Sequence, residues 1–442
     1  MPKKDPKLQE LAKAVKLCLE DEDFDLYKDI FFEDLKSGFI GLTDSRQKAK
    51  VKHFLHDCIG IVMFCSFSDI DEWHEMEMFA NDNIDVLKQY LELPNGIPSH
   101  DTLERALSII KESELQNVLV DILRNSIIKA SANIDGYIYS NPELGIYIKD
   151  VVAIDGKETC KTGKPNAETV EGQRNLNMLN VQSTETGVTL SSTRINEKSN
   201  EIPEAQRVLK QLDLKGCVVT ADAINTQKDT AKAIVEDAKA DYCLAVKGNQ
   251  GNLYRDIVDY FEDESLIADI KAVEGRYLKE SEETSTKETI WEHYITDDIQ
   301  WYEDKNSWKS LKSFGYVKKT IRDKKENTES VEKRYYICSF KPQAELLAIV
   351  TRRHWHIENT LHWVLDVVFK EDSLHTREKK ALQNLGLINR FVLSILKILK
   401  PYYNDISYRY IRRKIGRDLE KNIPIIFATL KIMTEMGAEL GS

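Results

Sequence analysis

The stretch CVVTADAINTQKDTAKAIVEDAKADYCLAVKGNQ (217–250) alternates between strand and helix patterns. Its first apolar run, Cys217 to Ala221, ends at Asp222, and a second run spans Tyr242 to Val246. Each run has the length and the β-branched content of a buried strand, and the residues between them suit a helix. A strand, a helix and a strand in this order favour two parallel strands in one sheet, with the helix packed on its face.

Three further strand patterns precede this unit. Ile146 to Ile154 ends in an apolar run, so we expect this strand to stop at Asp155. Leu176 to Gln182 and Val188 to Arg194 are joined by a hairpin-like turn. With a helix expected at about 201–212, the order becomes β-β-β-α-β-α-β-α. This order predicts an α/β fold, α+β overall, with a mixed sheet and flanking helices.

The rest of the chain differs in pattern from this region. Residues 1–132 carry apolar residues at three- and four-residue spacing without a strand pattern, and Ser99 is a suitable helix N-cap. We therefore expect a helical N-terminal domain over 1–132 and an α/β domain over 145–400. The α/β domain is expected to contain a mainly β, acidic insertion at about 256–340. A basic helical tail is expected over 401–442.

The composition is that of an ordinary folded protein. Of 442 residues, 42% are hydrophobic and 31% are charged, which excludes a disordered or fibrous chain. The seven cysteines form no CxxC pair, so a disulfide framework or a zinc finger is not expected. The longest apolar run, Cys58 to Cys65, is less than half of the ~20 residues that span a bilayer. We expect a cytoplasmic protein without a membrane segment.

The formal net charge of −11 conceals an uneven distribution. From Asp256 to Trp308 there are 16 acidic and 5 basic residues, whereas Thr376 to Lys421 has 12 basic and 4 acidic ones. Within the basic part, Lys400 to Arg417 alternates tyrosines with basic residues. Such a segment suits contacts to nucleic-acid phosphates and bases, or else an amphipathic helix whose tyrosines face the core. Its candidate phosphate contacts are Arg412, Arg413 and Lys414.

Two groups of polar residues suggest chemistry. Asp155 and Asp222 both follow apolar strands, where ligands gather in α/β sheets; the alternative is that each aspartate caps the next turn. His354, Glu358 and His362 are four residues apart on a predicted helix and share a face. A carboxylate between two imidazoles suits a metal or phosphate environment, and the alternative is a solvated polar face. Zinc fits poorly, since the HExxH spacing is missing.

These motifs resemble those of the DDE transposases of bacterial insertion sequences, in the group that includes the H-repeat-associated proteins. The resemblance implies an RNase-H-like fold preceded by a helical domain for end recognition or assembly. The usual Tyr-x2-Arg-x3-Glu-x6-Lys signature is replaced by a subgroup variant, with Thr351, His354 and Leu365 at the Tyr, Arg and Lys positions. The matching stretches are PNGIPSHDTLERALSII (94–110), IDGK (154–157), KSNEIP (198–203), VVTADAINTQ (218–227), DYCLAVKGNQ (241–250) and HWHIENTLHWVLDVVFKED (354–372).

The resemblance also implies a function. Asp155, Asp222 and Glu358 would form the catalytic triad and hold two Mg²⁺ ions about 3.5–4 Å apart, for which Mn²⁺ would substitute. The reaction would be metal-dependent cleavage at the ends of the insertion sequence and transfer of the 3′-hydroxyl ends into target DNA. The expected partners are double-stranded DNA, as terminal inverted repeats and as target, and a second copy of the chain in a homodimer or higher synaptic multimer. The expected location is the bacterial cytoplasm, with the nucleoid.

Further polar residues near the motifs are candidate DNA contacts. For the 247–250 stretch the alternative is a turn in which Gly248 supplies a positive φ. Two other functions also remain open: a domesticated RNase-H-like DNA nuclease, and an inactive DNA-binding or interaction protein derived from a transposase. Terminal inverted repeats beside the gene would favour the transposase. The candidate DNA contacts outside the basic C-terminal segment are Lys157, Lys247, Asn249, Gln250, Arg352, His354 and His362.

Overall fold

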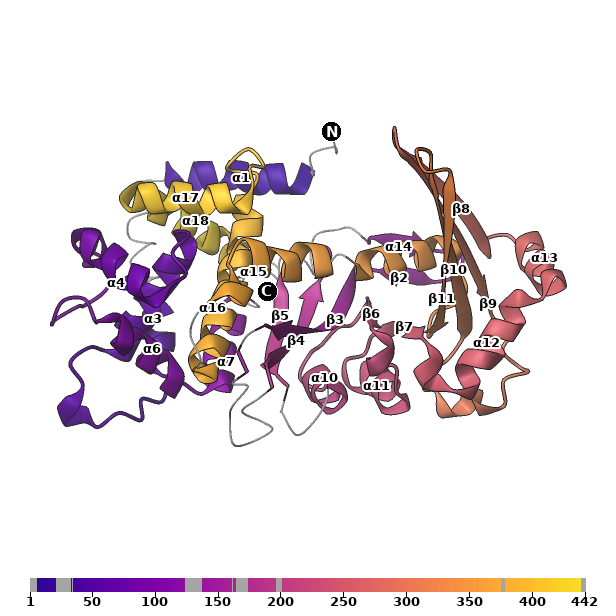
Figure 1. The fold of residues 1–442 in the computed structure, drawn as a ribbon, viewed down its shortest axis with the longest axis horizontal. Coiled ribbons are helices and arrows are strands. Elements are labelled where there is room, and N and C mark those ends of the chain that lie inside the picture. Colours follow the sequence, from indigo (N-terminus) through magenta and orange to yellow (C-terminus); the bar gives the residue numbers. More distant parts are fainter. Residues whose placement is uncertain are drawn as a thin grey trace.

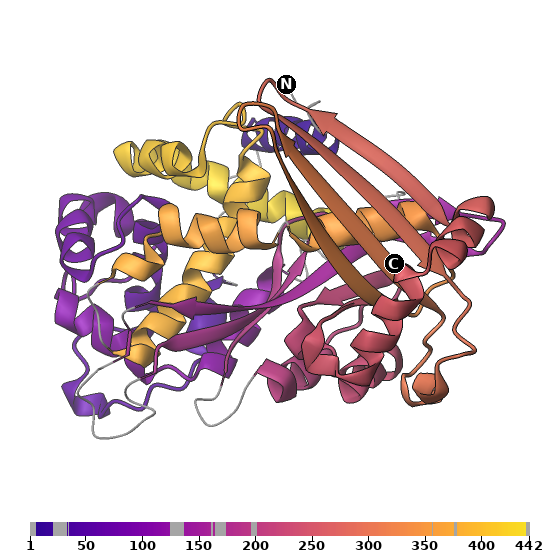
Figure 2. The same cartoon turned by 45° about the vertical axis from the view of Figure 1, so that its right-hand side comes forward.

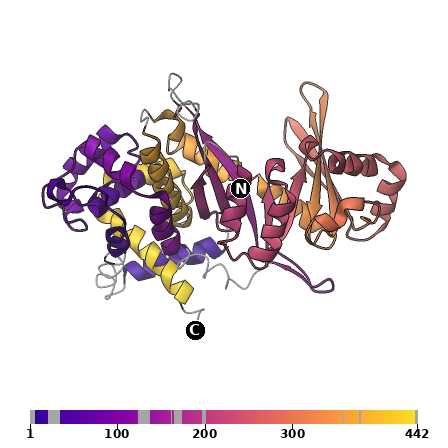
Figure 3. The ribbon, with the colours of Figure 1, turned by 90° about the horizontal axis from the view of Figure 1, so that it is seen from below.

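A computed structural model describes residues 6–20, 33, 35–123, 137–160, 162–163, 174–195, 201–355, 357–374 and 378–438. Its centre is a nine-stranded sheet in the order β5-β4-β3-β6-β7-β11-β10-β9-β8. Helices from both ends of the chain gather at one end of this sheet, and four long strands form the other end (Figures 1 and 3). The predicted α/β fold with a mixed sheet and a helical N-terminal region is confirmed.

Five strands form the part of the sheet that the sequence predicts. Strands β3, β6 and β7 are parallel, β4 is antiparallel to β3, and β5 is antiparallel to β4. The order β5-β4-β3-β6-β7 follows from a three-strand meander continued by two parallel strands, as expected for the RNase-H-like arrangement. The bounds are β3 (Asp150–Thr159), β4 (Leu176–Ser183), β5 (Thr189–Arg194), β6 (Cys217–Ala221) and β7 (Asp241–Val246).

The strand predicted at 146–154 is in fact two strands. Its first residues form β2 (Ile146–Ile148), which pairs with β1 (Tyr139–Asn141) in a separate two-stranded sheet. Its remainder belongs to β3, which continues past Asp155 to Thr159. The predicted stop at Asp155 is therefore wrong, because β4 keeps pairing with β3 through this polar stretch.

Helices cover both faces of this sheet (Figure 1). On one face lies α14 (Ala344–His354), whose buried Leu347 and Val350 pack in one cluster with Val151 and Val218 of the strands. On the other face lie α10 (Glu201–Leu209) and α11 (Lys228–Lys232), the latter continued by the π-helical turn η4 (Ala233–Asp237). The central strands are thus buried on both sides, which fixes where each strand ends relative to its neighbours.

The acidic insertion extends the main sheet. Strand β11 pairs antiparallel with β7, and β10, β9 and β8 follow in turn, rising beside α14 (Figure 2). Many acidic side chains of this region pair with basic residues on the next strand, such as Glu288 with Arg322 and Glu292 with Lys318. The bounds are α12 (Asn252–Glu262), α13 (Glu264–Ala272), β8 (Tyr277–Glu283), β9 (Lys287–Thr296), η6 (Glu303–Ser307), β10 (Ser313–Asp323) and β11 (Thr328–Cys338).

The helices at the two ends of the chain form one helical body. Helix α16 is buried over most of its length among α3, α6 and α7, and α18 packs against α1. The described part of the expected basic tail is thus packed, since α17 also contacts α3. The bounds are α1 (Pro6–Leu19), η1 (Lys48–Lys50), α3 (Leu55–Phe67), α4 (Trp73–Asp82), α5 (Ile84–Leu87), α6 (His100–Ile109), α7 (Glu112–Leu123), α16 (Lys379–Leu399), α17 (Tyr408–Arg417) and α18 (Leu419–Ala438).

In the described part of the chain, one helix, α16, has the length and apolar character that crossing a bilayer would need. Every residue of its most apolar window is buried inside the protein. We therefore interpret α16 as the core helix of the helical body.

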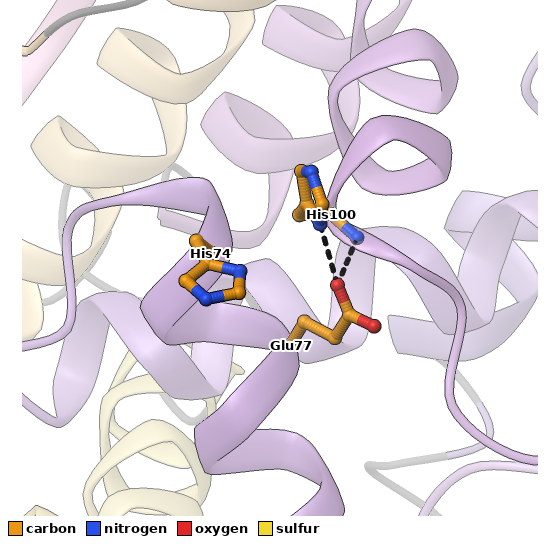
Figure 4. Close-up of side chains that lie close together, drawn as sticks. All are labelled: His74, Glu77 and His100. Atoms are coloured by element: carbon orange, nitrogen blue, oxygen red, sulfur yellow. Dashed lines mark hydrogen bonds and ion pairs between the residues drawn. The ribbon is translucent and has the colours of Figure 1, made fainter.

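The N-terminus of α6 is capped from another helix (Figure 4). Ser99 occupies the N-cap position as predicted, but its side chain accepts no capping hydrogen bond. Instead, Glu77 Oε2 of α4 accepts from the backbone N–H of His100 at 2.8 Å and lies 2.6 Å from its ring Nδ1. These bonds lower the pKa of Glu77 and raise that of His100. A carboxylate at this helix end also opposes the positive end of the helix dipole.

Candidate active site

Asp155 and Asp222 lie side by side on neighbouring parallel strands. The last register pair of β3 and β6 is Ile154 with Ala221, and the two aspartates directly follow these two residues in the chain. Strand β6 ends there, whereas β3 continues with Asp155 opposite Asn180 of β4. The parallel pairing therefore ends just before these two carboxylates.

Asp222 does not serve as a helix cap. It precedes the short 3-10 turn η3 (Ala223–Asn225), but its side chain makes no capping hydrogen bond. The side chain is 47% exposed, and the imidazole of His354 lies 3.7 Å away, measured from Nε2 to Oδ1. This imidazole lowers the pKa of Asp222, so its carboxyl group is ionised at neutral pH.

The residues after β7 hold the loop that follows Asp222. In the turn η5 (Gly248–Gln250), the Asn249 amide donates to the carbonyl of Ala223 at 2.9 Å, and the Gln250 amide donates to that of Thr226 at 2.5 Å. Both amide groups thus support the loop after Asp222, and the DNA contacts at Asn249, which is exposed, and Gln250, which is partly buried, stay predictions. Lys247 is exposed, and its charge acts on Asp222. The positive φ of this turn belongs to Gly251, not to Gly248.

The segment that carries Glu358 reaches both aspartates. After α14 ends at His354, the chain forms a π-helical turn, η7 (Glu358–His362), and then α15 (Trp363–Val367). His354 lies beside Asp222, and His362 Nδ1 lies 3.5 Å from Asp155 Oδ2. Both imidazoles are only 13% exposed, so the alternative of a solvated polar face is wrong for them. Glu358 itself is exposed between them, and its charge acts on Asp155.

The acidic groups influence one another strongly. Burial, together with the negative charges of Asp222, Glu201 and Glu358, raises the pKa of Asp155 to about 7. A cation would stabilise the ionised form of this carboxyl group, and carboxylate oxygens are the ligands that hard divalent ions prefer. The donor set at this sheet edge therefore fits such an ion.

A more compact group of possible metal ligands lies elsewhere. This group consists of His74, Glu77 and His100 (Figure 4). Among the described residues, their possible ligand atoms all lie within 4.8 Å of one another. They lie on α4 and α6 of the helical body, and the helix capping described above accounts for their closest contacts. The acidic residues of the sheet edge are spaced more widely.

A buried hydrogen-bond network orients His362. Arg390 Nε and Ser192 Oγ both donate to Asn180 Oδ1, at 2.7 and 2.8 Å, which directs the Asn180 amide nitrogen toward His362 Nε2 at 3.4 Å. Burial lowers the pKa of His362 to about 3, so the ring is neutral. With Nε2 as the acceptor, the proton resides on Nδ1, which faces Asp155. The sequence reasoning missed this network, although a polar Asn180 in a buried strand was a usable signal.

Lys157 is part of the protein interior. Its ammonium group lies 2.5 Å from Asp366 Oδ1 and 3.8 Å from carboxylate oxygens of Glu371 and Asp372, and its side chain is 4% exposed. The predicted phosphate contact at Lys157 is therefore wrong, because three carboxylates neutralise a charge that is shielded from solvent. Its role is to tie β3 to α15 and to the turn η8 (Glu371–Ser373), which follow Glu358.

Replacing Lys157 by methionine is expected to lower the free energy of unfolding by about 3 kcal/mol, because it removes the cation that faces the carboxylates of Asp366 and Glu371. Urea unfolding of the full chain measures this loss. The matched control is Lys149→Met, which removes an exposed lysine near the start of the same strand and should change stability by less than about 0.5 kcal/mol. Equal effects of the two substitutions would contradict the role assigned to Lys157.

The remaining candidate DNA contacts lie on α14 and α17. Arg352 is half exposed, forms an ion pair with Glu280 and lies over the Trp291 ring, 5.7 Å from its centroid. Arg413 and Lys414 are exposed on α17, in the helical body. Arg412 is fully buried, so its predicted phosphate contact is wrong. The four tyrosines between Lys400 and Arg417 differ in exposure: Tyr403 is buried, Tyr402 and Tyr408 are partly buried, and Tyr410 is 66% exposed.

The fold and the site together define a class. A mixed sheet in this strand order, with acidic side chains at its opened parallel edge and a third on a nearby helical segment, is the architecture expected of RNase-H-like nucleic-acid enzymes. Comparison with known proteins gives the family. The model of the transposase DDE domain matches residues 147–395, and that of the domain associated with it matches residues 37–122. The chain therefore belongs to the DDE transposase family.

Individual relatives place it further within this family. It is 32% identical to the "Putative transposase YncI" of Escherichia coli O157:H7 over 85% of this chain and 90% of that protein. It is also 32% identical to the "H repeat-associated putative transposase YhhI" of Escherichia coli K12, over 85% and 92%. The resemblance to the H-repeat-associated group is thus confirmed. A solved piggyBac transposase synaptic complex with hairpin DNA covers 92% of this chain and 82% of its own, at 11% identity and a TM-score of 0.39, too low to support an inference.

Proposed function

We propose that this protein is an active transposase that cuts DNA at the ends of its own insertion sequence and joins the 3′-hydroxyl ends to target DNA. Asp155, Asp222 and Glu358 are the catalytic residues and the ligands of divalent cations, Mg²⁺ or Mn²⁺. One observation carries the proposal: two histidines that flank Glu358 reach the two aspartates, so segments 136 residues apart in the sequence converge on one sheet edge. The family membership supports the same reaction class.

The reaction consists of two displacements at phosphorus. In the first, water attacks a phosphodiester and releases a 3′-hydroxyl; in the second, that hydroxyl attacks a phosphodiester of the target. When bound, divalent cations activate the attacking oxygen and stabilise the leaving oxygen. Asp155 and Asp222, which adjoin the last register pair of β3 and β6, would hold the cations together with the exposed Glu358.

The neighbouring residues orient this machinery. The neutral His362 faces Asp155 Oδ2 with Nδ1–H and so orients this carboxylate. His354 keeps Asp222 ionised. Lys247, exposed on the loop beside Asp222, is placed to bind a DNA phosphate. Arg413 and Lys414 are proposed as further DNA contacts, on a helical body that recognises the ends or supports assembly into a dimer or higher multimer.

The proposal is tested by cleavage and joining of a labelled duplex taken from the flanks of the gene in its host, which we expect to be a bacterium. With Mg²⁺ or Mn²⁺, the wild type should nick the duplex at the element boundary and join it to a second DNA. Glu358→Gln should bind the duplex without cutting it. Binding without cleavage by the wild type in either metal would instead support an inactive DNA-binding protein, and cleavage without preference for the boundary would support a domesticated nuclease.

A further inference from the structure

Glu201 lies against the backbone beside Asp155. It is the first residue of α10, on the sheet face opposite α14 (Figure 1). A Cβ atom added to Gly156, the residue after Asp155, would meet the Glu201 Oε1 atom at 2.1 Å. The carboxylate therefore fills the space that any side chain at position 156 would need. The sequence explains both features, since the IDGK and KSNEIP stretches place a glycine and a glutamate at these two positions.

The turn after Asp222 holds the same carboxylate. Asn225, which is fully buried, donates from Nδ2 to Glu201 Oε2 at 3.2 Å, and its turn begins directly after Asp222. Two elements, β3 and the turn after β6, thus meet at Glu201, and they adjoin or carry Asp155 and Asp222.

Glu201 shares the electrostatic environment of the two aspartates. Its negative charge acts on Asp155, and the charge of Asp222 acts on Glu201. Carboxylates that only support a fold are normally kept apart or paired with cations, since like charges in a partly buried site repel each other. Here the backbone is shaped to bring Glu201 toward two other acids, which is unfavourable unless a cation is shared among them.

We propose that Glu201 is a fourth carboxylate of the metal site, which holds a divalent cation together with Asp155 from the α10 side of the sheet. This inference rests on the proposed function, because it requires that the two aspartates bind metal. A fourth carboxylate would supply one of the two cations with a further oxygen ligand, the ligand type that Mg²⁺ and Mn²⁺ prefer. Glu201 would bind the cation directly or through a water molecule.

The test is a calorimetric titration of the full-length protein with Mn²⁺ in the absence of DNA. Glu201→Gln keeps the shape and the acceptor oxygen for Asn225 but removes the charge, and it is expected to weaken Mn²⁺ binding by about 10-fold or more. The matched control is Glu204→Gln, one turn along α10, where the glutamate forms a surface ion pair with Arg207. This control is expected to bind Mn²⁺ like the wild type.

The outcomes separate the two levels of the proposal. If Glu201→Gln binds Mn²⁺ as the wild type does while Asp155→Asn loses binding, Glu201 only anchors α10, and the inference is overturned while the proposed function stands. If the wild type and Asp155→Asn bind Mn²⁺ equally weakly, the metal site itself is rejected, and the proposed function with it. Thermal unfolding of Glu201→Gln without metal gives a further check, because a variant relieved of repulsion should be at least as stable as the wild type.

Discussion

Replacing Asp155 by asparagine is expected to lower the rate of DNA cleavage by about a thousandfold or more. Asp155 is the most buried of the proposed triad and lies where the parallel pairing of β3 and β6 opens, so no other side chain can take its position. Metal-ion stabilisation of the transition state is worth several kcal/mol, and about 4 kcal/mol corresponds to a factor of a thousand. Single-turnover cleavage of the labelled element end measures the loss.

The same substitution is expected to stabilise the protein in the absence of metal. The pKa of Asp155 is raised to about 7 in the folded protein, above the ordinary value of 3.8, so its ionised form destabilises the fold. This penalty is absent below about pH 4, grows as the pH rises to 7 and then stays constant. Each unit of pKa corresponds to about 1.4 kcal/mol, so the penalty at neutral pH is at most a few kcal/mol.

The measurement is thermal unfolding between pH 4 and 8, with a chelator and with Mg²⁺ or Mn²⁺. Relative to Asp155→Asn, the wild type should lose stability from pH 4 to 7 in the chelator and regain it when either ion is added. Asp155→Asn should show a flatter profile and gain less from the ion. Asp150, whose pKa burial raises to about 6, contributes the same pH dependence in both proteins and cancels from the comparison. Identical responses to metal in the two proteins would refute the site.

The strands of the central sheet were predictable because their local signals agree with their surroundings. The predicted runs at 217–221 and 242–246 match β6 and β7 to within one residue, since buried parallel strands are apolar throughout. The β-β-β-α-β-α-β-α order allowed the strands of Asp155 and Asp222 to be neighbours, and β3 does pair with β6. The continuation of β3 to Thr159 was not predictable, because its polar residues are held in a strand by β4 and not by their own pattern.

The insertion shows the same limit. Strand β8 has the sequence YLKESEE, and its charged side chains at an exposed sheet edge hide the strand from a search for apolar runs. The sequence shows the acidic excess of this region, but not that lysines and arginines of neighbouring segments pair with many of its carboxylates. The pairing depends on the register of strands, which composition does not contain.

Charge alone also misled the choice of DNA contacts. Lys157 and Arg412 stand in basic or catalytic-looking stretches, yet each is buried against carboxylates more than 200 residues away in the sequence. The opposite holds for Glu201, which sequence reasoning passed over although it stands in a recognised motif. What distinguishes the three is the partner that folding supplies, and a single sequence does not specify it.

Replacing Arg412 by methionine is expected to lower the free energy of unfolding by about 3–5 kcal/mol, the largest effect on stability that we predict. The guanidinium group is fully buried and donates to the carbonyl oxygens of Ser66 and Val368, at 2.7 and 2.6 Å, and to Asp71 Oδ1 at 2.5 Å. It also lies over the Phe369 ring, 4.2 Å from its centroid. Asp71 is buried too, so the substitution leaves a carboxylate without its main cation.

The control is Arg413→Met, one residue along α17. Arg413 is 49% exposed and bonds only to Asp69 among the described residues, so its loss should cost less than about 1 kcal/mol. Arg412→Lys should fall between the two, because an ammonium keeps the charge but cannot replace the planar fork that reaches four partners, Asp69 among them. Urea unfolding ranks the three variants. A loss for Arg412→Met no larger than that for Arg413→Met would mean that the guanidinium does not hold α17, α3 and the segment after α15 together.

The effects of the two methionine variants on DNA binding should be the reverse of their effects on stability. Arg413→Met should reduce the salt dependence of DNA binding, because only an exposed cation can displace counterions from a phosphate. The folded fraction of Arg412→Met should bind DNA with the salt dependence of the wild type.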